Sequence, residues 1–160
     1  MIVVADTSPI NYPIQIECVA LLHELYNSIL IPVAVADELR HHGAPAEIRR
    51  WMNDVPDWVV VRSGPVTDIR GLEHVDRGEL EAILLAQDLK AELLLMDERE
   101  GCKQAARSGF ATTGTLGVLL IAGLNGLVDA EAAYQRLITQ TNFRTSPRLQ
   151  QKFLDLAGRA

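Results

Sequence analysis

Five short apolar runs alternate with helical segments, and this alternation constrains the fold of the chain more than any other feature. The expected strands are residues 2–5, 28–32, 57–62, 92–97 and 110–113. Segments with helical spacing or helix-end signals lie between them, at 18–26, 33–42, 46–55, 76–91 and 99–109. Strands that alternate with helices predict a mostly parallel sheet with helices on both of its faces.

The rest of the chain is expected to complete one domain over residues 1–160. Glycine and proline residues predict a loop at 63–75. Helices are expected at 115–126, 129–141 and 146–159, the last with Ser146 as N-cap and Pro147 in its first turn. Residues 129–160 are therefore expected to be C-terminal helices.

Composition excludes several classes of protein. Apolar residues make up 48% of the chain, which is enough for a sizeable core. Cys18 and Cys102 match no metal-binding spacing and are typical of reduced thiols in a cytoplasmic protein. The start "MIVVADTS" lacks the basic segment of a signal peptide, and the run "GVLLIAG" is too short to cross a membrane. The net charge of −6 argues against nucleic-acid binding over the whole surface, but it allows a local basic edge.

Two carboxylates follow directly on expected strands. Asp6 ends the first strand and Asp97 ends the fourth. Ligands of open α/β sheets bind beyond the carboxyl ends of the strands, so both side chains are expected at that edge. If the two strands are neighbours, the carboxylates lie roughly 5–10 Å apart. For each residue alone, an ordinary turn or helix-cap role is the alternative.

Two further acids lie on expected helices. Glu79 shares a face with the apolar residues at i+3, i+4 and i+7, whereas Glu81 lies about 200° away around the helix. We therefore expect Glu79 to face the site, and a capping box with Asp76 is the alternative. Glu38 lies beside apolar residues on the helix at 33–42, and its alternative is a solvent-exposed acid.

Four converging carboxylates without a basic partner would repel one another and resist desolvation. A hard divalent cation removes both problems, and Mg²⁺ and Mn²⁺ prefer oxygen ligands. The histidines are scattered and form no zinc motif, and the chain has no Walker phosphate loop. The sequence therefore predicts Mg²⁺ or Mn²⁺ as the cofactor.

Four segments carry a resemblance to a known family: "VVADTSPIN", "VAVADEL", "DRGELEAILLAQDLKAELLLMDE" and "TGTLGVLL". They resemble the PIN domain family, and within it the little-characterised prokaryotic PIN-like proteins related to VapC-type toxins. The similarity covers residues 2–128. Its most specific element is the ordered set of acids, with the 18-residue step from Glu79 to Asp97 that links the third and fourth acids in PIN domains.

The resemblance implies a three-layer α/β/α fold with a central, mostly parallel five-stranded sheet in the order 3-2-1-4-5. It also implies a metal-dependent ribonuclease in which Asp6, Glu38, Glu79 and Asp97 are the first to fourth acids. Asp6, Glu79 and Asp97 are expected to hold the metal directly, and Glu38 to bind it or to position a water.

Three details accompany the resemblance. Ser8 matches the small hydroxyl residue that helps to orient the first acid. Glu79 stands where typical VapC-type toxins have Asp. Pro13 is expected to interrupt the usual first helix.

Two segments are expected to contact the phosphates of RNA. Thr113 and Thr115 flank a glycine before a helix, where backbone N–H groups can hold a phosphate; an ordinary threonine N-cap is the alternative. Residues 139–160 carry four basic residues against one acid. Among them Arg144, Arg148 and Lys152 are expected to bind RNA, and a solvated or subunit-binding face is the alternative.

The predicted function is that of an Mg²⁺- or Mn²⁺-dependent endoribonuclease. One expected role for this activity is that of the toxin in a toxin–antitoxin pair, with a cognate antitoxin as the protein partner. The alternative is a non-catalytic PIN-like module that binds nucleic acid or protein. A phosphotransfer domain with Asp6 as nucleophile would need a second Asp two residues on, where Ser8 stands. The apolar segments 19–26 and 47–55, together with the resemblance, predict a homodimer.

Overall fold

The computed structural model of the chain describes residues 1–65, 70–71 and 73–158. A five-stranded sheet forms its centre, with the strand order β3-β2-β1-β4-β5 and every neighbouring pair parallel. The strands are β1 (Val3–Ala5), β2 (Ile29–Pro32), β3 (Val59–Arg62), β4 (Leu93–Leu95) and β5 (Thr112–Thr113). This architecture confirms the predicted α/β fold and its strand order.

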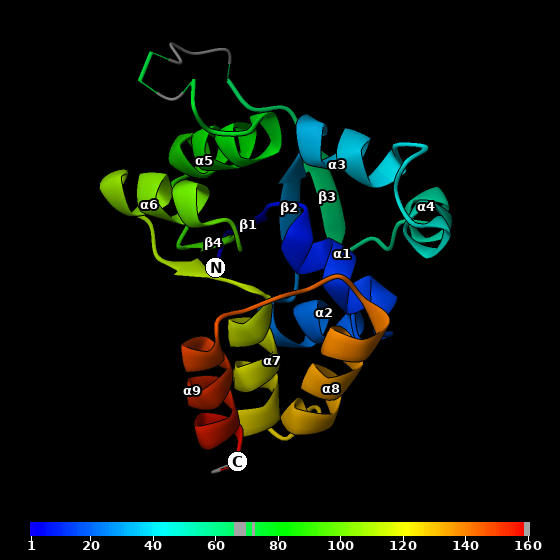
Figure 1. Ribbon diagram of the computed structural model, residues 1–160. Helices are drawn as coiled ribbons and strands as arrows, with labels where there is room; N and C mark the ends of the chain where they lie inside the picture. The colour runs from blue at the N-terminus through cyan, green and yellow to red at the C-terminus, as the bar shows by residue number, and fades with distance from the viewer. Residues whose placement is uncertain (66–69, 72, 159–160) are drawn as a thin grey trace.

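Helices pack against both faces of the sheet (Figure 1). On one face lie α1 (Ser8–Gln15), α2 (Ala20–Tyr26), α3 (Val33–Arg40) and α4 (Ala46–Asn53). On the other lie α5 (Arg77–Leu89) and α6 (Arg99–Arg107). The three C-terminal helices, α7 (Thr115–Leu124), α8 (Ala130–Gln140) and α9 (Pro147–Ala157), pack together beside α1 and α2.

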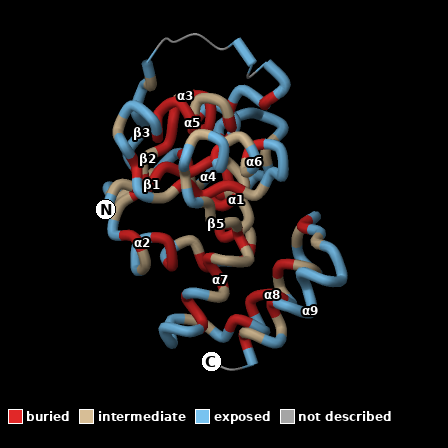
Figure 2. The backbone as a smooth tube through the Cα atoms, turned by 90° about the vertical axis from the view of Figure 1, so that its left-hand side faces the viewer, coloured by how far each residue is buried: buried red, intermediate tan, exposed pale blue. Residues whose placement is uncertain are grey.

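Alternate residues of the central strand supply the cores of the two faces. Val3 and Ala5 pack with α1 to α4, whereas Val4 packs with α5 and α6. All three are fully buried, as is usual for a strand that is covered on both faces by helices. In Figure 2 the buried residues, in red, gather in the interior around α1, α3, α4 and α5, and the exposed residues lie on the outer turns and loops.

The expectation that Pro13 interrupts the first helix was wrong, because α1 runs through Pro13 to Gln15. Pro13 lacks the N–H that would donate to the carbonyl of residue 9, and the helix ends two residues further on, at Gln15. Its side chain is buried, and its carbonyl accepts a 2.8 Å hydrogen bond from the Cys18 N–H that closes the helix end.

The C-terminal helices follow the predicted signals. The side chain of Ser146 accepts a hydrogen bond from the Leu149 N–H and so caps α9, with Pro147 in the first turn. Residues 141–146 link α8 to α9 and cross the end of α7 that is nearest to the sheet (Figure 1). Arg159 lies outside the described residues, as do 66–69 and 72 of the expected loop at 63–75.

The apolar segments that suggested a homodimer are packed within this chain. Large apolar side chains of α2 and α4 are buried in the core between these helices and the sheet, among them Leu22, Tyr26, Ile48 and Met52. Their apolar character therefore gives no argument for a second copy, and the homodimer stays a prediction from the family resemblance. Cys18 and Cys102 are free thiols. Among the described residues, no helix is long and apolar enough to span a membrane.

Gly123 of α7 is expected to be required for the packing of α7 against α8. A Cβ placed on Gly123 would lie 2.7 Å from the Cβ of Ala130, and both residues are buried. We expect Gly123→Ala to lower the free energy of unfolding by about 1–3 kcal/mol in urea denaturation, in spite of alanine's better helix propensity. Adding Ala130→Gly should recover part of the loss. A single Gly123→Ala variant that is more stable than the wild type would contradict this packing.

Candidate active site

Asp6 and Asp97 leave the same edge of the sheet from neighbouring strands. β1 and β4 pair in parallel, with Ala5 opposite Leu95, so the two acids begin the next segments side by side. The Asp6 N–H extends this pairing by a 2.9 Å hydrogen bond to the Leu95 carbonyl. The Asp6 side chain is only 4% exposed, which is unusual for a carboxylate.

Asp6 and Glu38 meet at the first turn of α5. A Cβ placed on Gly78 would lie 2.5 Å from Oε1 of Glu38 and 3.3 Å from Oδ1 of Asp6. Any residue other than glycine at position 78 would therefore displace the Glu38 carboxylate. Glu38 is exposed at the end of α3, and the Thr7 hydroxyl donates a 2.5 Å hydrogen bond to its Oε2.

Glu79 extends from α5 towards α6. It is 7% exposed, and its Oε2 would lie 3.1 Å from a Cβ placed on Gly101. The neighbouring acid Asp76 caps α5, because its side chain accepts from the Gly78 N–H, and the Asp76 backbone N–H in turn bonds the Glu79 carboxyl. Glu79 therefore takes part in the capping box and lies next to the other acids at the same time.

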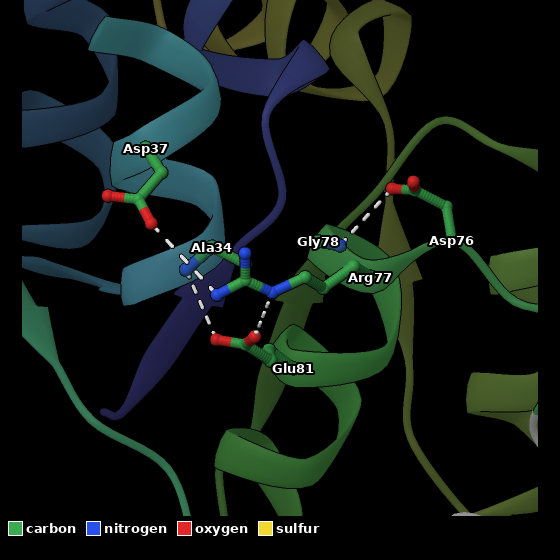
Figure 3. Close-up of polar contacts among 6 residues, drawn as sticks. All are labelled: Ala34, Asp37, Asp76, Arg77, Gly78 and Glu81. Atoms are coloured by element: carbon green, nitrogen blue, oxygen red, sulfur yellow. Dashed lines mark hydrogen bonds and ion pairs between the residues drawn. The ribbon is translucent and has the colours of Figure 1, made fainter. Parts of the chain in front are cut away.

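Glu81, the other acid of this turn, has different partners (Figure 3). Its carboxylate accepts from the Ala34 N–H at 3.1 Å and from Nε of Arg77 at 2.9 Å. Nη2 of Arg77 also lies 4.0 Å from Oδ2 of Asp37. Glu81 thus caps α3 and pairs with Arg77, which leaves Glu79 as the acid of α5 that faces the sheet edge.

Asp97 is held at the start of α7. The Thr115 N–H donates to its Oδ1 at 2.7 Å and the Thr115 hydroxyl to its Oδ2 at 2.6 Å. A Cβ on Gly114 would lie 2.5 Å from Oδ1. Asp97, rather than a threonine, therefore caps α7, and the Thr115 N–H is not available to a phosphate. The Thr113 carbonyl accepts from the Met96 N–H within the sheet.

Burial and mutual repulsion raise the pKa values of these acids. Burial raises the pKa of Asp6 to about 7, with added repulsion from Glu79, Glu38 and Asp76. Burial likewise raises the pKa of Glu79 to about 7, helped by other acids. The pKa of Asp97 is also raised, mainly by burial, although its bonds to Thr115 oppose the change. Among the described residues, every charged neighbour that acts on these three carboxyls is itself an acid.

The donor set suits a hard divalent cation, which prefers carboxylate oxygens and offsets like-charge repulsion. Within the described part of the chain, however, no three acidic, histidine or cysteine side chains form a group that would enclose a metal ion as it stands. Two of the four acids are bonded to hydroxyls instead, Glu38 to Thr7 and Asp97 to Thr115. Each carboxylate oxygen has a second lone pair that these bonds leave available.

A cavity of ≈ 500 Å³ opens beside Asp97 and Glu98. Ser8 lines it, and in the described structure no hydrogen bond joins its hydroxyl to Asp6; the Thr7 backbone N–H bonds Asp6 instead. Arg144 also lines this cavity, whereas Arg148 and Lys152 line a different hollow along α9. Of the expected RNA-binding residues, the structure therefore brings only Arg144 to the acidic edge.

Sequence reasoning missed Thr7 and Tyr12. The hydroxyl of Thr7 sits one residue after Asp6, and only its position beside α3 makes it a partner of Glu38. Tyr12 lines the cavity from α1, and its hydroxyl donates to Oδ1 of Asn142 at 2.9 Å. Burial and the charges of Asp97 and Glu98 raise the pKa of Tyr12, and Arg144 opposes them.

The raised pKa values predict how the stability of the metal-free protein depends on pH. Asp6 and Glu79 titrate near pH 7 in the folded chain, against ordinary values of 3.8 and 4.5. The folded state therefore retains protons that the unfolded state releases, and this stabilisation is lost as pH rises through about 7. We expect the free energy of unfolding in EDTA to fall by on the order of 1–2 kcal/mol per group between pH 5.5 and 8.

Asp6→Asn should make this pH dependence shallower, because the variant has one carboxyl fewer whose pKa is raised in the folded state. If the stability of the metal-free wild-type protein stays level or increases from pH 5.5 to 8, the pKa values of these carboxyls are not raised by folding.

Comparison with known proteins identifies the family. A search of curated proteins found none that matches the chain. Among solved structures, the chain is similar to a PilT N-terminus domain protein from the hyperthermophilic archaeon Sulfolobus solfataricus P2, with 15% identity and a TM-score of 0.49 over 91% of this chain and 100% of that one. The family model described as a PIN domain matches residues 2–159. The chain therefore belongs to the PIN domain family, whose members are generally nucleases.

Proposed function

We propose that this chain is a divalent-metal-dependent endoribonuclease. The observation that carries the proposal is the burial of Asp6 and Glu79 at the carboxyl edge of the sheet, close to one another and to Glu38 and Asp76. Burial of uncompensated carboxylates is costly, and a site that retains it is a candidate for function. Membership of a nuclease-type family supports hydrolysis of nucleic-acid phosphodiesters as the reaction class that we propose for this site.

Each acid has a separate part in the proposal. Asp6, Glu79 and Asp97 would hold Mg²⁺ or Mn²⁺ directly, and Glu38, the exposed member, would bind it or position a water. Thr115 and Thr7 fix the orientations of Asp97 and Glu38 through their hydroxyls. When bound, the cation stabilises the negative charge that develops on a phosphodiester.

The proposed substrate is RNA, which Arg144, Arg148 and Lys152 would attract to an edge that is otherwise acidic. One setting for such an activity is the toxin of a toxin–antitoxin pair, in which a cognate antitoxin binds the chain. The proposed assembly is a homodimer. The alternative function is a PIN-like module that binds nucleic acid or protein without turnover.

Asp97→Asn is expected to lower both Mn²⁺ affinity and RNA cleavage by about 100-fold or more, because a direct ligand is lost. Thr115→Val is expected to lower both by about 10–100-fold, because only the hydrogen bond that orients Asp97 is lost. Isothermal titration with Mn²⁺ and cleavage of a generic RNA would measure both. Glu100→Gln, an exposed acid of α6 that pairs with Lys103, is the matched control and should change neither.

Two results separate the alternatives. Full cleavage by Asp97→Asn would remove Asp97 from the site. Mn²⁺ binding by the wild type without cleavage of any RNA would favour the binding module.

Replacing Arg144, Arg148 and Lys152 together by Gln is expected to weaken RNA binding and leave Mn²⁺ affinity unchanged. Each lost phosphate contact should reduce the salt dependence of log K by about 0.7 on single strands. Fluorescence anisotropy at several salt concentrations would measure the slope. A triple variant with the wild-type RNA affinity and salt slope would exclude a substrate role for this basic surface.

A further inference from the structure

The cavity beside Asp97 combines three kinds of wall. Asp97 and Glu98 form its acidic side, Arg144 is its cation, and Tyr12, Phe143 and Leu149 are among its apolar residues. Its volume of ≈ 500 Å³ lies within the range of about 300–1,000 Å³ that is usual for small-molecule sites. Such a cavity suits a ligand with both an anionic group and a flat apolar part.

Arg144 is fixed by the backbone rather than by an acid. Its Nη1 donates to the Phe143 carbonyl at 2.7 Å, and this bond leaves most of the guanidinium N–H donors available. In the part of the chain that the structure describes, no ion pair joins Arg144 to a carboxylate. An exposed arginine that lines a cavity without an acidic partner is well suited to bind a phosphate.

The segment that carries Arg144 is anchored on both sides. Before it, the Tyr12 hydroxyl bonds Asn142, and the rings of Tyr12 and Phe143 meet edge to face with centroids 5.1 Å apart. After it, Ser146 caps α9. Residues 141–146 are therefore pinned to α1 and to α9, and Arg144 is preorganised beside Asp97.

Leu149 completes the apolar wall. It is 53% exposed, it follows the capped start of α9, and it lines the same cavity as Arg144. A single exposed leucine is ordinary on a protein surface. Here it lines the same ≈ 500 Å³ cavity as Arg144, and a flat ring bound in that cavity would cover it.

We propose that this cavity is a nucleotide subsite, which takes one unpaired nucleotide adjoining the scissile phosphate. Arg144 binds the phosphate of that nucleotide, and its base lies against Leu149 and the Tyr12–Phe143 pair. Tyr12 is a positioning residue, because its bond to Asn142 holds the segment that carries Arg144. This inference rests on the proposed ribonuclease function and adds to that function a defined binding site for one nucleotide.

The subsite is tested without metal and without turnover. Adenosine 5′-monophosphate, ribose 5-phosphate and inorganic phosphate are titrated into the full chain in EDTA, and binding is followed by NMR chemical-shift changes. The two smaller probes share the phosphate but lack the base. We expect the mononucleotide to bind about fivefold or more tightly than either of them, because the base contributes its own stacking energy.

Variants of the lining residues test which part of the mononucleotide each residue binds. Arg144→Gln should weaken mononucleotide binding by about tenfold or more, because a charge-assisted bond is lost. Leu149→Ala should weaken the mononucleotide and leave ribose 5-phosphate unchanged. Tyr12→Phe keeps the ring but removes the bond to Asn142, so it should weaken the binding of all three probes, because each carries the phosphate that Arg144 binds. Arg50→Gln, an exposed arginine on the last turn of α4, is the matched control.

Several results would overturn the subsite. Equal affinity for the three probes would mean that Arg144 binds phosphate by charge alone and that no base is recognised. Mononucleotide binding that is unaffected by Arg144→Gln and Leu149→Ala would place the nucleotide elsewhere. If Tyr12→Phe binds every probe as tightly as the wild type, Tyr12 has no positioning role.

The subsite and the proposed function fail in different ways. Loss of RNA cleavage in Asp97→Asn, with mononucleotide binding insensitive to Arg144 and Leu149, would reject the subsite alone. If mononucleotide binding depends on Arg144 and Leu149 but Asp97→Asn still cleaves RNA fully, the proposed metal site is rejected and the nucleotide subsite is retained.

Discussion

The burial of several carboxylates together at one edge of the sheet is the constraint on which the rest of the site depends. Asp6 and Glu79 are buried there beside other acids, and burial keeps their pKa values near 7. Glycines at positions 78, 101 and 114 allow the backbone to approach these carboxylates without a clash. Because this burial is costly and the chain belongs to a nuclease-type family, we propose this edge as the binding site for a cation and a phosphodiester.

Asp97 connects this edge to the C-terminal helices. The same carboxylate that is proposed to bind metal also caps α7 through the N–H and hydroxyl of Thr115. The segment between α8 and α9 then returns to the same place, where Tyr12 of α1 binds Asn142. The C-terminal part of the chain therefore lines one side of the cavity beside Asp97 as well as covering the core, because Arg144 of the link and Leu149 of α9 both line that cavity.

Local pattern in the sequence predicted the α/β class and placed Asp6 and Asp97 at the carboxyl edge of the sheet, whereas the strand order that makes their strands neighbours came from the family resemblance. Alternating strands and helices place Asp6 and Asp97 at the same edge, and helical spacing separates Glu79 from Glu81. Contacts between distant segments left no such pattern: Tyr12 and Asn142 are 130 positions apart, and their bond exists only in the folded chain. The helix through Pro13 was also missed, because the burial of its ring and the hydrogen bond from the Cys18 N–H to its carbonyl exist only in the folded chain.

A crystal structure with Mn²⁺, located by its anomalous scattering, tests the central claim most directly. The account predicts an anomalous peak among the carboxylates of Asp6, Glu79 and Asp97, with Glu38 beside it, and no such peak in crystals of Asp6→Asn grown in the same way. A fully occupied peak at another group of acids, or none at this edge at Mn²⁺ concentrations that support cleavage, would contradict it.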